Sequence, residues 1–206
     1  QFDYRSYPKG SWVLHMLRSQ LGEDLYRKCI KAYLEKHALT SVVSDDLRQV
    51  IEQHSGRPMD RFFDQWLYHP RHPDLKISYK WMPKQNIVKV NIKQTQKLDD
   101  DVLQFHFPTK LRFIADGMLV DYPIKVTKVE EDFYVPLNKQ PSIVRFDPDY
   151  SVLANVSFDK PNGMLKKQLE NNQDMVGRLL ACKLLGTRKT HESVELLTKA
   201  LQNDSF

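Results

Sequence analysis

The sequence lacks the long apolar segments and dense basic blocks that mark two large classes of protein. No apolar run approaches the roughly 18 residues that a membrane-spanning helix needs, so we expect no membrane span. The 31 basic and 26 acidic residues are spread along the whole length, without a cluster of Lys and Arg dense enough to follow a phosphate backbone. Nucleic acid is therefore not an expected partner.

Cysteine and the common catalytic signatures are scarce as well. Cys29 falls on the apolar side of a predicted helix and Cys182 lies far away along the chain, which favours two buried free thiols over a disulfide. No Gly-rich phosphate loop, nucleophile elbow or Cys/His signature occurs. His69 and His72 have no Cys or third carboxylate at ligand spacing, so we expect surface histidines rather than a zinc site.

What is present is typical of a globular protein. The composition is 41% apolar and 28% charged, and 206 residues suit one large domain or two to three small ones. The sequence has no initiator methionine and enters a helical pattern within a few residues of Gln1. We therefore expect the chain to be cut from a longer protein.

Residues 1–72 are expected to form four helices, because their hydrophobic period is helical. Pro8 suits a first helical turn, Gly22 and Gly56 suit helix ends, and Ser44 is the expected N-cap of the third helix. The positions expected to face inward are Val13, Leu14, Leu17 and Leu21, then Leu25, Tyr26, Cys29, Ile30, Tyr33 and Leu34, then Leu47, Val50, Ile51 and His54, and finally Met59, Phe62, Phe63, Trp66 and Leu67.

From Leu75 the period changes to two, which predicts a second domain over residues 73–158. Leu75–Trp81 and Val88–Ile92 alternate as a hairpin would. Leu103, Phe105 and Phe107 are expected on the next strand, and the turn Asp116-Gly117 between Leu111–Phe113 and Met118–Val126 predicts a second hairpin. Further runs follow at Phe133–Leu137 and Ile143–Phe146. Short strands at this spacing, without helix signals between them, favour a small antiparallel β-sandwich.

Helical period returns near Asp159, and residues 159–206 form the third expected domain, with a loop at residues 186–188. The segment resembles a HEAT repeat, in which an Asp, a Val, an Arg and an Ala recur on the second helix. A lone repeat cannot bury both of its faces, so we expect the helical array to continue. The residues that carry this resemblance are Asp174, Val176, Arg178 and Ala181.

Tyr7-Pro8-Lys9-Gly10 is the one stretch to which a chemical role can be assigned. A tyrosine held just before a helix start has its phenol at a set distance and angle, which suits a hydrogen-bond donor aimed at a developing oxyanion. The residues alone leave open the alternative that Tyr7 is a packing or capping residue.

A resemblance to a known family supports the catalytic interpretation. The stretch Tyr7-Pro8-Lys9-Gly10, then Asp45-Asp46-Leu47, and then residues 62–67 before Pro73 resemble the end of the catalytic domain in the aminopeptidase N family of zinc peptidases, gluzincins that include leukotriene A hydrolase. The resemblance is dense over about residues 4–81 and beyond them rests on the order of parts. It implies an α+β multidomain chain: the helical end of a thermolysin-like catalytic domain, a small antiparallel β-sandwich, and the start of a HEAT-like array.

The resemblance implies a specific role for Tyr7. The tyrosine of the family's Tyr-x-Lys-Gly element donates a hydrogen bond to the oxyanion of the tetrahedral intermediate and shares that charge with zinc. The family's His-Glu-x-x-His helix, third zinc ligand and Gly-rich element precede that tyrosine and do not occur here, so we expect them before Gln1. The chain alone should then hold no zinc and hydrolyse no peptide. The intact protein would use zinc and a peptide substrate, and this chain would contact the rest of its polypeptide on both sides.

Two non-enzymatic alternatives remain open. The intact protein could have kept the peptidase architecture but lost its zinc site, and would then act as an interaction scaffold. Alternatively, Tyr79 and Trp81 could form an aromatic platform for a carbohydrate or peptide. They share a strand face with Leu75 and Ile77, so we interpret them as core residues.

Overall fold

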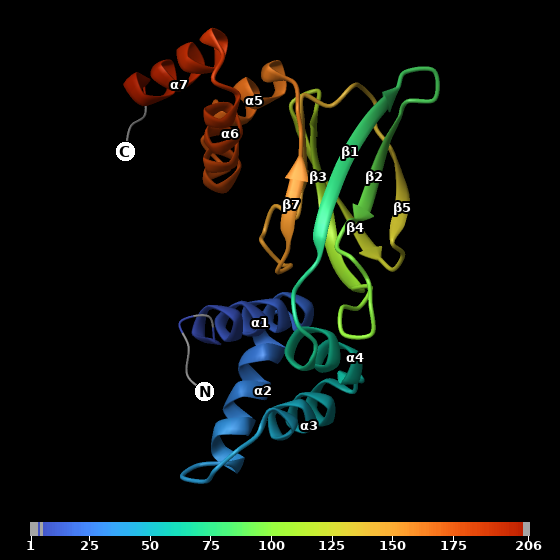
Figure 1. Ribbon diagram of the computed structural model, residues 1–206, viewed down its shortest axis with the longest axis vertical. Helices are drawn as coiled ribbons and strands as arrows, with labels where there is room; N and C mark the ends of the chain where they lie inside the picture. The colour runs from blue at the N-terminus through green and yellow to red at the C-terminus, as the bar shows by residue number, and fades with distance from the viewer. Residues whose placement is uncertain (1–3, 5, 204–206) are drawn as a thin grey trace. The chain divides into compact units, whose positions relative to one another are not determined.

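The computed structural model describes residue 4 and residues 6–203, and the chain divides into two compact units (Figure 1). Unit 1 contains Gln1–Pro73 together with Gln96–Phe105 and Ser151–Asn155. Unit 2 contains Asp74–Thr95, His106–Tyr150 and Val156–Phe206. The fold is α+β, with helices at the N-terminal side, two small sheets, and helices at the C-terminal side.

Unit 1 contains the expected N-terminal helices. Its elements are α1 (Ser6–Leu21), α2 (Glu23–Lys36), α3 (Ser44–Ser55), the short α4 (Asp60–Phe63) and the π-helix η1 (Asp64–Tyr68). In α1 the inward stripe differs from the expected one at two positions: Leu14 is 38% exposed, whereas Met16, which was not expected to face inward, is completely buried. On α2 only Cys29 is buried among the described residues, and Leu34 is exposed.

Two of the three expected helix-end residues have the backbone geometry that they need. Gly22, between α1 and α2, has a φ of 83°, and Gly56 ends α3 in the left-handed conformation with a φ of 65°. Ser44, however, is the first residue of α3 and not its N-cap. Val43 takes the N-cap position, and its N–H donates to Asp46 Oδ2 at 2.8 Å, so the side chain of the third helical residue closes this end.

The fourth helix is α-helical only over Asp60–Phe63 and changes to a π-helix at Asp64. Gln65 and Trp66 of this π-helix are both buried, with exposures of 4% and 0%. The ring of Trp66 packs on that of Phe105, with 5.0 Å between their centroids. Phe105 was expected on a strand with Leu103, and that expectation is wrong: residues 96–105 form a loop of unit 1 whose aromatic side chain completes its core.

Unit 2 contains two antiparallel sheets, and both expected hairpins are confirmed. The first sheet has the order β5-β2-β1-β7 and the second β4-β3-β6. The strands are β1 (Asp74–Met82), β2 (Ile87–Gln94), β3 (Phe107–Ala115), β4 (Met118–Val126), β5 (Glu130–Pro136), β6 (Ile143–Phe146) and β7 (Asn155–Phe158). Strand β7 was not predicted, because only Phe158 of its four residues is buried and four residues carry too little alternation to detect.

Side chains alternate along the strands of unit 2. Val88, Val90 and Ile92 of β2 are completely buried, and so are Leu111 and Phe113 of β3. On β1, Leu75 and Ile77 are buried, while Tyr79 and Trp81 on the same face are half-buried. The Tyr79 ring meets that of Phe158 edge to face at 6.2 Å. These aromatic side chains extend a buried face and do not form an exposed platform.

The C-terminal helices of unit 2 are α5 (Asn162–Leu169), α6 (Met175–Arg188) and α7 (His191–Asn203). They pack around a small core of Leu165, Leu169, Ala181 and Leu185. The loop expected at residues 186–188 is wrong, because α6 continues to Arg188 and ends at Lys189, whose φ of 52° is left-handed. Cys182 is half-buried beside this core, and Cys29 and Cys182 are both free thiols.

The contact between Trp66 and Phe105 makes a testable contribution to stability. Replacing Trp66 with Ala removes a completely buried indole and should lower the free energy of unfolding by about 3–5 kcal/mol. Urea denaturation followed by circular dichroism measures the change. Tyr68→Ala is the matched control on the same π-helix, because Tyr68 is 59% exposed and should cost far less. Equal losses in the two variants would contradict this role for the contact.

Candidate functional site

Tyr7 lies in the first turn of α1, and not before the helix as expected, because the helix begins at Ser6. Its side chain is 71% exposed. Pro8 follows it within the first turn, where helical N–H groups have no partner inside the helix and a missing one costs nothing. The hydroxyl of Ser11 donates to the Pro8 carbonyl at 3.0 Å, which ties this turn to the next. The Tyr7 side chain is thus exposed at the surface, on the first turn of a regular helix.

The rest of α1 is held firmly within unit 1. At its C-terminal end, Arg57 Nη1 donates to the carbonyl of Gln20 at 3.0 Å, and Arg18 pairs with Glu23 at 2.5 Å. The buried stripe begins at Val13, so the core fixes the later turns of the helix, and the first turn takes its direction from them because the helix is continuous. The buried residues of α1 are Val13, Met16, Leu17 and Leu21.

Gly10 has no steric explanation within the described residues. A Cβ atom added there would meet nothing within 4 Å, and Gly10 does not need a left-handed backbone. Neither the packing nor the backbone conformation of the described residues therefore explains a glycine at this position.

The described residues do not fit a zinc ion. No group of three or more His, Cys, Asp or Glu side chains among them could hold a metal. His69 instead serves unit 1: its Nδ1 lies 2.9 Å from the carbonyl oxygen of Asp101, and its Nε2 lies 3.4 Å from Asp64 Oδ1. The imidazole thus links the π-helix to the loop that carries Phe105, a role that spacing in the sequence could not reveal.

A charged pocket of unit 1 lies between α3 and the π-helix, lined partly by Asp45, Arg48, Asp60 and Tyr68. Arg48 pairs with Asp45 at 2.7 Å and with Asp60 at 2.5 Å, and it also reaches Glu52 at 3.2 Å. Hydrogen bonds from Arg48 and Gln49 lower the pKa of Asp45 below its usual range. These carboxylates hold α3 to α4 through one guanidinium group, so the pocket is best explained as structural.

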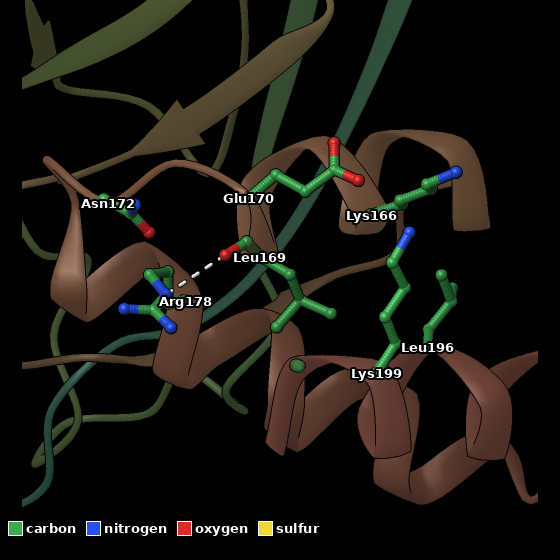
Figure 2. Close-up of a pocket in the computed structure, with 8 residues that line it drawn as sticks. Lys166, Leu169, Glu170, Asn172, Arg178, Leu196 and Lys199 are labelled. Atoms are coloured by element: carbon green, nitrogen blue, oxygen red, sulfur yellow. Dashed lines mark hydrogen bonds between the residues drawn. The ribbon is translucent and has the colours of Figure 1, made fainter. Parts of the chain in front are cut away.

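A second pocket, of about 280 Å³, lies among the C-terminal helices of unit 2 (Figure 2). Arg178 at its edge donates from Nε to the carbonyl of Leu169 at 3.1 Å, which joins α6 to the end of α5. Lys166 and Lys199 reach the pocket from α5 and α7. Arg178, a residue of the expected HEAT pattern, therefore fastens two helices, although this contact does not by itself identify a repeat.

Among the described residues, every helix is too short or too polar to span a membrane.

Known proteins with similar sequences identify the family of this chain. The chain is 36% identical over 214 residues to the tricorn protease-interacting factor F2 of Thermoplasma volcanium, an alignment that covers 98% of this chain and 25% of that protein. It is 42% identical over 67 residues to aminopeptidase N of Lactococcus lactis, which covers 32% of this chain and 8% of that protein.

A solved structure extends the similarity of fold to the whole chain. It is the structure of aminopeptidase A from Legionella pneumophila in complex with aspartic acid, with a TM-score of 0.80 and 13% sequence identity. The match covers 100% of this chain and 25% of that one, so the chain spans about a quarter of the length of such proteins. Residues 1–66 match the Peptidase family M1 domain. The chain therefore belongs to peptidase family M1, the aminopeptidase N family.

Proposed function

We propose that this chain is part of a zinc-dependent aminopeptidase and that Tyr7 donates the hydrogen bond that stabilises the oxyanion. The observation that carries the proposal is the position of Tyr7: an exposed phenol in the first turn of a helix whose later turns, from Val13 to Leu21, are anchored in the core of unit 1. Family membership and the name aminopeptidase among the relatives agree with the proposed activity.

The chemistry assigned to Tyr7 depends on when charge appears. A phenol O–H held in place gains most when the carbonyl oxygen of a peptide becomes an oxyanion, so its hydrogen bond lowers the barrier more than it strengthens substrate binding. A helix anchored by a buried stripe avoids the cost of aligning the donor during the reaction. Zinc, held by residues outside the described part of this chain, would polarise the same carbonyl.

The same proposal includes the domain organisation. Residues 1–72 would complete a thermolysin-like catalytic domain, residues 73–158 a β-sandwich, and residues 159–206 the start of a HEAT-like helical array. The two antiparallel sheets of unit 2 support a sandwich, and the packing of α5, α6 and α7 around one core supports an array.

Tyr7→Phe in the complete protein tests the role of the phenol. Losing one oxyanion donor should cost about 3 kcal/mol of transition-state stabilisation, which lowers kcat by roughly 10²- to 10³-fold. The measurement is steady-state hydrolysis of aminoacyl anilides, with zinc content and melting temperature determined on the same preparation. Tyr68→Phe is the control, because Tyr68 is also exposed in unit 1 and should leave kcat unchanged. A kcat near that of the unsubstituted protein in Tyr7→Phe would remove Tyr7 from the mechanism.

Zinc content separates the peptidase from the scaffold alternative. We expect about one zinc ion per polypeptide in the complete protein, as in a single catalytic site, and loss of hydrolysis after chelation. The 206-residue chain alone should hold none. Absence of zinc from the complete protein, together with replacement of the His-Glu-x-x-His element, would instead favour a scaffold that acts through its sheets and helices.

A further inference from the structure

Arg145 is a charged residue buried where the C-terminal helices meet a sheet. It lies on β6 opposite Arg112 of β3, so both side chains leave the same face of the β4-β3-β6 sheet. Only 1% of the Arg145 side chain is exposed. Its Nη1 pairs with the carboxylate of Asp174, while its Nε and Nη2 are buried without a hydrogen-bond partner among the described residues. The guanidinium is thus only partly satisfied.

Asp174 connects this arginine to helix α6. It is the N-cap residue of α6, and its Oδ1 accepts the N–H of Gly177 at 2.8 Å. A Cβ atom at Gly177 would collide with both Arg145 and Asp174, so the helix approaches the ion pair as closely as a glycine allows. One carboxylate therefore both begins the helix and holds it to β6.

Two further polar side chains complete the cluster. Gln168 of α5 is completely buried, and its Nε2 donates to the Gly177 carbonyl at 2.5 Å. Its Oε1 accepts from Lys160 Nζ at 3.0 Å. Lys160 is 5% exposed, lies between β7 and α5, and places its ammonium 4.7 Å from the ring centroid of Phe158. We refer to Arg145, Lys160, Gln168 and Asp174 together as the polar latch.

The charges around Lys160 do not balance when it is protonated. Arg145 and Asp174 face it from β6 and α6, so two cations would then share one carboxylate. Asp159 beside it is 93% exposed and pairs with Arg188 of α6 at 2.5 Å, while Arg112 pairs with Asp121 at 2.6 Å. When Lys160 is neutral, its amine can still donate to Gln168, and Arg145 and Asp174 form a balanced pair.

We propose that the polar latch is a pH-controlled attachment of helices α5 and α6 to the β4-β3-β6 sheet, which is tight when Lys160 is neutral and weakened when Lys160 is protonated. Buried ion pairs tolerate an extra charge poorly, because the interior cannot solvate it. The inference does not depend on the role of Tyr7.

The direction of the pH effect follows from the two states of Lys160. Burial, and secondly the charge of Arg145, lower the pKa of Lys160 to about 7 from its ordinary value of 10.5, against the opposing effect of Asp174. Between these two values the detached state binds a proton that the attached state does not, so attachment strengthens as the pH rises from 7. Below about pH 7 both states are protonated, and this contribution is at its constant minimum.

Hydrogen exchange of the complete protein tests the proposal. The measured exchange rates are corrected for the intrinsic rates, under conditions in which exchange reports the opening equilibrium. Between pH 7 and 9 the protection factors of the amides in α5 and α6 should rise by up to about tenfold per pH unit, which is the limit for one linked proton. The amides of the β1 and β2 hairpin serve as an internal reference, because they lie outside the latch.

Two variants identify the group responsible. Lys160→Met should make protection of α5 and α6 independent of pH over this range. Lys167→Met replaces an exposed lysine of α5 and should keep the original slope. A flat profile in the unsubstituted protein, or an unchanged slope in Lys160→Met, would overturn the proposal. If Lys160→Met does not fold, an NMR titration of the Lys160 side chain in the unsubstituted protein decides: a midpoint near 7 supports the latch, and one near 10.5 refutes it.

Discussion

Burial of one face of α1 is the interaction on which the candidate site depends. A stripe of apolar side chains from Val13 to Leu21 enters the core of unit 1, and Arg57 fastens the far end of the helix. An isolated helix of this length would be marginal in water, so its position comes from packing and not from propensity. Tyr7 itself is exposed, so the orientation of its side chain depends on the buried residues later in the same helix.

The ion pairs of unit 2 fall into two kinds, those at a partly exposed surface and the buried pair of Arg145 and Asp174. On β3, Lys110 and Arg112 share Asp121 and Asp149 at a partly exposed surface, and hydrogen bonds from Arg112 lower the pKa of the Asp121 carboxyl. Such pairs add little to stability, because water screens them. Arg145 lies on the neighbouring strand and on the same face of the sheet, but it is buried from solvent. Removing its partner Asp174 would leave a buried charge unpaired, so this pair affects stability far more than the exposed ones do.

Family membership changes how the exposed surfaces of the chain are understood. The chain spans about a quarter of the length of the factor F2 and of the solved aminopeptidase A, so a surface of this chain can face other parts of a longer polypeptide. Gly10, which has no steric reason within the described residues, and the exposed Tyr7 lie in the same first turns of α1. Because Gly10 has no side chain, the surface beside the exposed Tyr7 has room for a residue from another part of a longer polypeptide.

The sequence by itself determined the elements whose signal is local. Helical and two-residue periods located the N-terminal helices and both hairpins, and the Tyr7-Pro8-Lys9-Gly10 stretch pointed to the family. Tertiary structure alone decided the rest. Phe105 lies in a loop, not on the expected strand, and its ring packs against that of Trp66. Strand β7 pairs at the edge of a sheet, and Lys160 is buried among the helices that follow it in the chain. In each case burial is created by residues distant in the chain, and periodicity over a short window does not contain that information.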